Sequence, residues 1–253
     1  MFSRLMNKQF FVVLLVLLLQ VSSCTSSKTI QYENIPLQRA QIELAEAQLL
    51  DIGILIFDPN LPKEEQELIF PEVRKAEARY MPYHLKTTLE DTGFWGGIWV
   101  LPEKSEAMDL IVSGRVEISN GLKVAVRIGV WDITGKEWIN KVYETTVSQS
   151  AYSKRRDHTQ DPYQNLYNKI SNDLLEIKNL LSLAELQRIS EIGDLRFAAE
   201  LIPDVYEDYL EKNSKDIISA IRLPSENDAM MERIRSVKER EFILVDTLNE
   251  YYA

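Results

Sequence analysis

The chemically distinctive residue of this chain is its one cysteine, Cys24. Arg4 and Lys8 precede an unbroken apolar run over residues 10–19, and the small residues 21–23 lead directly into the thiol. A basic head, an apolar segment and a small-residue cleavage site are the layout of a bacterial secretory signal. The run is about ten residues long, whereas a membrane-spanning helix needs ~20. We therefore predict that residues 1–23 are a removable signal peptide and not a permanent transmembrane anchor.

The position of Cys24 directly after that site makes residues 21–24 resemble a lipobox, and the chain resembles the bacterial lipoproteins. The resemblance implies cleavage before Cys24, attachment of a diacylglycerol to its thiol, and acylation of the new amine with a chain such as palmitate. Two acyl chains hold a protein stably on a membrane. Thr25 stands where aspartate favours inner-membrane retention, so we expect an outer-membrane anchor facing the periplasm. The alternative is an ordinary secretory signal that leaves a free thiol.

Other residues capable of catalysis are two histidines, His84 and His158, and the abundant acids. A metal site needs three or four ligands, and no His-x-x-x-His or His-x-x-Glu spacing occurs in the sequence. No Gly-x-Ser-x-Gly motif or glycine-rich phosphate loop is present either. A carboxylate pair of the glycosidase kind stays open, but nothing nominates one pair. We expect no catalytic residue, metal or cofactor, and interpret His84 as a partly buried structural residue.

Two features are candidate partner contacts. The cluster Lys154-Arg155-Arg156 is a local exception to the acidic balance, and it is either a solvated turn or a docking site for an acidic partner or a glycan carboxylate. Phe94, Trp95 and Trp99 lie beside Gly96-Gly97. They either cover the sheet edge as core, which we favour, or form an exposed aromatic patch for a partner, in which Trp95 and Trp99 would be the contacts.

The net charge of −10 falls to −12 when the signal and its two basic residues are removed. A chain this acidic is a poor candidate for binding nucleic acid, whose phosphates require a basic surface. We therefore expect partners other than nucleic acid.

The apolar patterns predict an α+β fold, a two-layer α/β sandwich containing an antiparallel meander. A continuous apolar run over 52–57 suits a buried strand, and Pro71 suits the first turn of a helix. A short strand over 98–101 follows, and then alternating residues over 109–147 form the meander, with a turn at Asn120-Gly121.

From Pro162 onward every signal is helical, and Gly193, Pro203 and Pro224 divide the last part into about four helices. We predict that the first of these helices lies beside the one that begins at Pro71, in the same layer. The predicted organisation is a signal over 1–23, a lipidated tether over 24–40, the sandwich over 41–182, and a C-terminal helical unit over 183–253.

The last helix carries one anomaly. A projection at 100° per residue places Glu241 at the centre of its apolar face. Because an unpaired buried carboxylate is costly, we expect a basic partner such as Arg196 or Arg222, or a position at the edge of the face. The other residues of this face are Met230, Ile234, Val237, Leu244 and Leu248.

The order of elements resembles a group of envelope domains that includes the amino-terminal domain of TolB, LpoB and the periplasmic part of CsgG. The similarity rests on a buried strand before a long helix and on Gly-Phe-Trp-Gly-Gly-Ile-Trp-Val at 93–100. It continues with Asp-Leu-Ile-Val-Ser-Gly at 109–114, the Asn-Gly hairpin and the Asp-x-x-Gly turn at 132–135. The resemblance implies binding and assembly roles in the envelope. The helical tail resembles an uncharacterised group of proteobacterial lipoproteins.

These features predict an outer-membrane lipoprotein that acts as a non-catalytic binding or assembly accessory, with an envelope protein or peptidoglycan as partner. One alternative is a peptidoglycan hydrolase with a carboxylate pair, which a deep acid-lined cleft would favour. Another is a carrier, which a sealed apolar cavity would favour.

Overall fold

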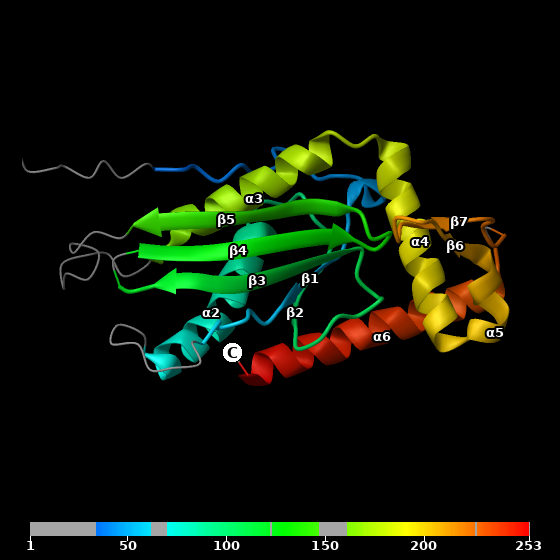
Figure 1. Ribbon diagram of the computed structural model, residues 1–253. Coiled ribbons are helices and arrows are strands. Elements are labelled where there is room, and N and C mark those ends of the chain that lie inside the picture. Colours follow the sequence, from blue (N-terminus) through cyan, green and yellow to red (C-terminus); the bar gives the residue numbers. More distant parts are fainter. Residues whose placement is uncertain (1–33, 62–69, 122, 147–160, 226, 253) are drawn as a thin grey trace, which may run out of the picture. The chain divides into compact units, whose positions relative to one another are not determined.

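A mixed five-stranded sheet organises the computed structural model, with the strand order β2-β1-β3-β4-β5 (Figure 1). The structure describes residues 34–61, 70–121, 123–146, 161–225 and 227–252. The strands are β1 (Ile52–Leu55), β2 (Ile98–Leu101), β3 (Leu110–Ser119), β4 (Lys123–Asp132) and β5 (Glu137–Thr146). This α+β architecture agrees with the predicted sandwich.

The sheet combines a parallel part and an antiparallel part. β1 lies between β2 and β3 and pairs in parallel with both, with Ile52 opposite Ile98 and Leu110. β3, β4 and β5 form the predicted antiparallel meander. Because β1 and β3 run in the same direction, the residues that precede them meet at one edge of the sheet.

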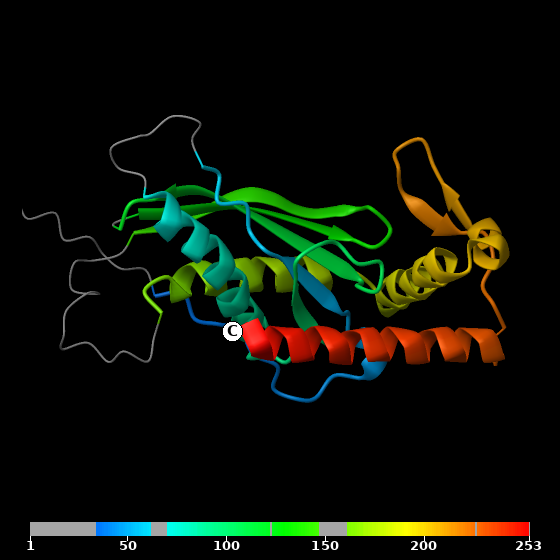
Figure 2. The same ribbon diagram turned by 90° about the horizontal axis from the view of Figure 1, so that it is seen from below.

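Helices α2 (Pro71–Glu90) and α3 (Gln164–Asn179) form the second layer (Figure 2). α3 contacts both β5 and α2, which confirms the prediction that the two helices share a layer. Ile170 and Leu174 of α3 are 2% and 1% exposed and belong to the same core cluster as the inward residues of the meander. Those strand residues are Val112, Val116, Val124, Val126, Ile128 and Val130.

The segment after α3 is not wholly helical, which corrects the prediction. Between α4 and α6 the chain forms a two-stranded antiparallel hairpin, in which Leu210 pairs with Ala220 and Lys212 with Ile218. Each strand has three residues, too few to show an alternating pattern. The elements are α4 (Leu183–Leu201), α5 (Pro203–Tyr206), η4 (Glu207–Tyr209), β6 (Leu210–Lys212), β7 (Ile218–Ala220) and α6 (Ala229–Tyr252).

The C-terminal elements share hydrophobic cores with the sheet. Residues from 35 onward belong to one compact unit, with no division near residue 182. Leu186 and Ile189 of α4 join the core beneath the meander, and Met231 and Ile234 of α6 join a second cluster with Trp99 of β2. The predicted helical unit over 183–253 therefore completes the sandwich instead of standing apart from it. Across the described ranges, no helix combines the length and the apolar character that crossing a bilayer requires.

Candidate functional site

Two aspartates meet where β1 and β3 begin. Asp51 directly precedes β1 and Asp109 directly precedes β3, so the parallel register brings them together. The backbone N–H of Asp51 donates to Oδ2 of Asp109 at 3.0 Å. The N–H of Gly97 donates to Oδ1 of Asp51 at 2.8 Å. The topology thus builds an acidic pair at the edge of the sheet.

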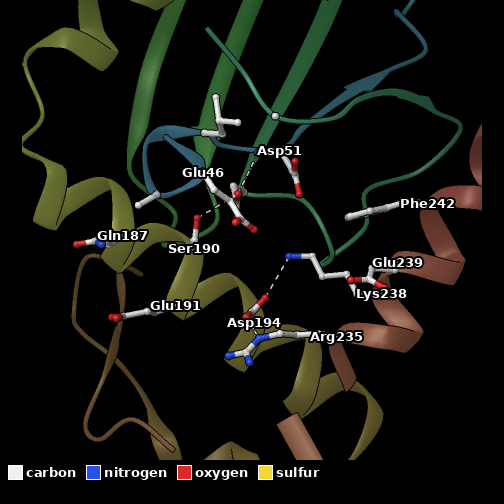
Figure 3. Close-up of a pocket in the computed structure, with 14 residues that line it drawn as sticks. Glu46, Asp51, Gln187, Ser190, Glu191, Asp194, Arg235, Lys238, Glu239 and Phe242 are labelled. Atoms are coloured by element: carbon white, nitrogen blue, oxygen red, sulfur yellow. Dashed lines mark hydrogen bonds and ion pairs between the residues drawn. The ribbon is translucent and has the colours of Figure 1, made fainter. Parts of the chain in front are cut away.

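A pocket of about 600 Å³ opens over this edge (Figure 3). Its wall comes from η2 (Glu46–Gln48), from the loops before β1, β2 and β3, and from α4 and α6. The side chains that line it include Glu46, Asp51, Asp109, Gln187, Ser190, Glu191, Asp194, Arg235, Lys238, Glu239 and Phe242.

The charges of the wall do not balance. Both of its cations bind the same carboxylate: Arg235 Nε lies 2.9 Å from Oδ2 of Asp194, and Lys238 Nζ lies 3.3 Å from Oδ1. Glu191 pairs with Arg188 outside the pocket, at 3.1 Å. The four other carboxylates of the wall have no cation within 4.0 Å among the described residues. They are Glu46, Asp51, Asp109 and Glu239.

Asp109 is the most buried of these carboxylates, at 3% exposure. Its Oδ2 accepts from the Asp51 N–H and from Ser190 Oγ, at 3.0 and 3.3 Å. Its Oδ1 is buried and has no hydrogen-bond donor in the described structure. Gly193 of α4 lies against it, since a Cβ built there would be 2.9 Å from Oδ1. A glycine at this position therefore lets α4 approach the aspartate.

Burial raises the pKa of Asp109 from 3.8 to about 6. The charge of Lys238 opposes this shift, whereas the negative charges of Asp51 and Asp194 add to it. Burial also raises the pKa of Asp51, and the hydrogen bond from Gly97 opposes that shift. Gathered acids with raised pKa values mark functional sites more often than ordinary surface. The two aspartates are therefore the strongest functional candidates in the described structure.

The accessible atoms decide what chemistry the pair can do. A general acid must reach its substrate within hydrogen-bond distance. Asp109 is enclosed, with Oδ2 occupied by two donors and Oδ1 packed against Gly193. Asp51 is only partly buried and is open to the pocket. Within the described ranges no three His, Cys, Asp or Glu side chains converge as a metal site. The arrangement suits binding of a positive group better than proton transfer.

The predicted aromatic contacts lie in the interior. Trp95 and Trp99 are 6% and 7% exposed. This burial confirms that they belong to the core and contradicts the alternative of an exposed aromatic patch. Trp95 joins the core beneath the sheet, and Trp99 stacks on Phe242 of α6. The other candidates, Cys24 and the cluster Lys154-Arg155-Arg156, lie outside the described residues, as does His158.

His84 is a structural residue of α2, as predicted. Its side chain is 30% exposed, its Nε2 lies 3.6 Å from Oδ2 of Asp161, and its ring stacks on Tyr167 with centroids 5.7 Å apart. Tyr80 Oη donates to the same carboxylate oxygen at 3.2 Å.

Glu241 has a different partner from the predicted ones. Its Oε1 accepts from Ser105 Oγ at 2.9 Å. Arg196 instead pairs with Glu106, and Arg222 lies over the Tyr209 ring, 4.1 Å from its centroid. A polar loop before β3 therefore satisfies this carboxylate without a basic side chain.

The sequence alone does not single out four residues of this site, which are Asp51, Asp109, Asp194 and Lys238. The available signal was an acid directly before two strands, at Asp51-Ile52 and Asp109-Leu110. This signal becomes informative only once those strands are known to be parallel neighbours.

Comparisons with known proteins leave the family open. No protein-family model and no curated protein sequence matches the chain. Among solved structures, a hypothetical protein from Chlamydia trachomatis aligns with a TM-score of 0.30 and 10% identity, covering 51% of this chain and 96% of that one. A TM-score of this size establishes neither a shared fold nor a shared function.

Proposed function

We propose that the protein is a lipid-anchored, non-catalytic binding or assembly accessory of the cell envelope, held in the outer membrane through Cys24. The pocket at the sheet edge is the place where it engages its ligand or partner. The lipobox-like segment supports the anchor, and the imbalance of charge in the pocket supports the binding role.

The observation that carries the binding role is the set of four carboxylates without a cation in the described structure. Gathering like charges at a partly buried site costs stability, and proteins accept such costs chiefly at functional sites. An incoming group of opposite charge relieves the repulsion. Binding therefore explains an arrangement that folding alone disfavours.

The second candidate function is an envelope hydrolase, because the pocket is acid-lined and Asp109 has the raised pKa of a general acid. The enclosure of Asp109 counts against it, since neither of its oxygens is presented to a substrate. The carrier alternative needs a closed apolar cavity, whereas this pocket is open and charged.

In-cell photocrosslinking tests the proposal. A photoreactive residue replaces the exposed Gln187 at the rim of the pocket, and a matched variant carries it at the exposed Glu207 outside the pocket. We expect a discrete crosslinked species from position 187 and none from 207, with loss of that species when Asp51→Asn or Cys24→Ser is added. Equal crosslinking from both positions, or an unchanged species in the double variants, would overturn the proposal.

A further inference from the structure

We propose that the pocket over Asp51 and Asp109 binds an aliphatic ammonium group, either of a small amine or of a lysine side chain on a partner. This inference rests on the proposed binding function and names its ligand chemistry. It is carried by the charge of the wall, by the buried carboxylate of Asp109 within that wall, and by an apolar surface beside them.

The charge of the ligand can be inferred from the charged residues that line the pocket. Asp51 and Glu239 present carboxylates without a basic partner in the described structure, from the sheet edge and from α6. The two cations of the wall pair with Asp194, although the charge of Lys238 also acts on Asp51 and Asp109. A negative ligand would meet these free carboxylates and be repelled, whereas a cation is attracted from several sides. The pocket is therefore selective for positive groups.

The burial of Asp109 is a second observation, separate from the number of acidic residues in the pocket wall. This carboxylate forms part of the pocket wall, is 3% exposed, and has one oxygen without a hydrogen-bond donor. Its unpaired Oδ1 lies against Gly193, which does not line the pocket, so a ligand can relieve only the buried negative charge of Asp109 and not the missing donor. A cation held at Asp51 compensates the charge of Asp109 without touching it.

The apolar part of the wall favours an ammonium on a hydrocarbon stem. Phe242, Leu49 and Ala47 line the pocket beside the acids. The protein's own Lys238 shows the geometry, since its Nζ reaches Asp194 while lying 5.9 Å from the centroid of the Phe242 ring. Alkyl-ammonium side chains commonly bury their stems on apolar surface and extend the charged end to a carboxylate.

The affinity depends on pH in a defined direction. The groups that face Asp109 are Asp51 before β1, Ser190 and Asp194 on α4, and Lys238 on α6. Because the pKa of Asp109 is about 6, this group gains its negative charge as the pH rises from 5 to 7. Affinity for an ammonium group therefore increases over that interval, and binding near pH 6 releases protons.

Calorimetric titration of the full chain in detergent micelles tests the inference. The probes are 1,5-diaminopentane, with 1,5-pentanediol as its neutral control, and a blocked lysine, with its ε-acetylated form as control. We expect heat from both amines, none from the neutral controls, and tighter binding at pH 7 than at pH 5. Tighter binding of the diamine indicates a small-molecule ligand, and tighter binding of the blocked lysine indicates a protein partner.

Two variants locate the binding. Asp51→Asn keeps an acceptor for the Gly97 N–H, and Glu239→Gln alters an exposed residue of α6, so we expect both variants to fold. Each should weaken binding about tenfold, as expected for loss of a charge-assisted contact, whereas the exposed control Asp208→Asn should leave it unchanged. The inference is wrong if the diol binds as well as the diamine, if neither amine gives heat, if both pocket variants bind normally, or if Mg²⁺ displaces the amine at equal concentration. Failed amine binding with persistent crosslinking from position 187 would overturn the ligand chemistry alone, and the opposite pattern would overturn the proposed function alone.

Discussion

Phe242 of α6 stacks on Trp99 of β2, with ring centroids 4.1 Å apart and an angle of 22° between the planes. The pair belongs to the cluster that joins α6 to the sheet, together with Met231 and Ile234. Phe242 also lines the pocket. The contact therefore holds α6 in place and shapes the binding surface at the same time.

Replacing Phe242 with alanine should lower the free energy of unfolding by about 2–4 kcal/mol, because the stack and its apolar burial are both lost. Chemical denaturation measures the change. The neighbouring Ile243 is 66% exposed, so Ile243→Ala is the matched control and should cost less than about 0.5 kcal/mol. Equal effects of the two substitutions would contradict the docking of α6 through this contact.

Asp109→Asn should stabilise the protein at pH 7. The folded-state pKa of about 6 lies above the ordinary 3.8, so the native state binds the proton more tightly. The stabilisation that arises from the tighter proton binding of Asp109 in the folded state is fully present below pH 3.8, and it is lost as the pH rises through 6. At 1.36 kcal/mol per pKa unit, this group changes the free energy of unfolding by at most about 3 kcal/mol between low and high pH.

The measurement is urea denaturation of the wild type and Asp109→Asn at pH 4, 5, 6 and 7. The stability difference in favour of the variant should grow with pH and level off above 6. Asp208→Asn controls for the removal of a surface charge and should show no such trend. A difference independent of pH would contradict the burial of an ionised carboxyl at this position.

Gly193→Ala should destabilise the protein, although alanine is favoured over glycine within a helix by about 1 kcal/mol. The added Cβ would lie 2.9 Å from Oδ1 of Asp109, so α4 or the aspartate must shift. Thermal unfolding measures the loss, and NMR spectra should show shifts at Asp109 and Ser190. A variant more stable than the wild type would show that α4 does not press on the aspartate.

Ile170→Ala and Leu174→Ala should each cost about 2–5 kcal/mol, because both side chains lie in the core between α3 and the meander. Leu180, just beyond α3, is 79% exposed and provides the control. Leu180→Ala should change the free energy of unfolding by less than about 0.5 kcal/mol. Similar losses at positions 170 and 180 would contradict the packing of α3.

Cys24→Ser should abolish metabolic labelling with a palmitate analogue and leave the precursor uncut after Ser23. The hydroxyl cannot take the place of the thiol that the lipid would modify. Immunoblotting of membrane fractions follows the anchoring. Normal processing and unchanged membrane fractionation of the variant would overturn the lipoprotein assignment.

Sequence patterns predicted the strands of the meander well, because one buried face imposes alternation on residues such as Val124 and Val126. The predicted apolar face of α6 is correct at Ile234, which is 3% exposed, and wrong at other positions. Val237 and Leu244 were expected inside, yet they are 43% and 58% exposed, whereas Lys238 is 8% exposed. Lys238 is buried because it pairs with Asp194, but an analysis of hydrophobic periodicity assigns every lysine to the exposed face. The sequence therefore does not show that Lys238 belongs to the buried side of this helix.

The acidic pair could not be predicted for a different reason. Asp51 and Asp109 are far apart in the chain, and they meet because β1 and β3 are parallel neighbours. Parallel pairing requires a crossover, which local sequence does not specify. The site therefore belongs to the topology and not to a motif.

The wall of the pocket is drawn from segments as far apart in the chain as Glu46 and Glu239. A ligand bound there contacts elements that come together only in the complete fold. The ligand therefore binds the folded state and not the unfolded chain. At a concentration one hundred times its dissociation constant, such a ligand increases the free energy of unfolding by about 2.7 kcal/mol. The melting temperature thus becomes an assay in itself, able to reveal the natural ligand in a screen of metabolites without knowledge of its pathway.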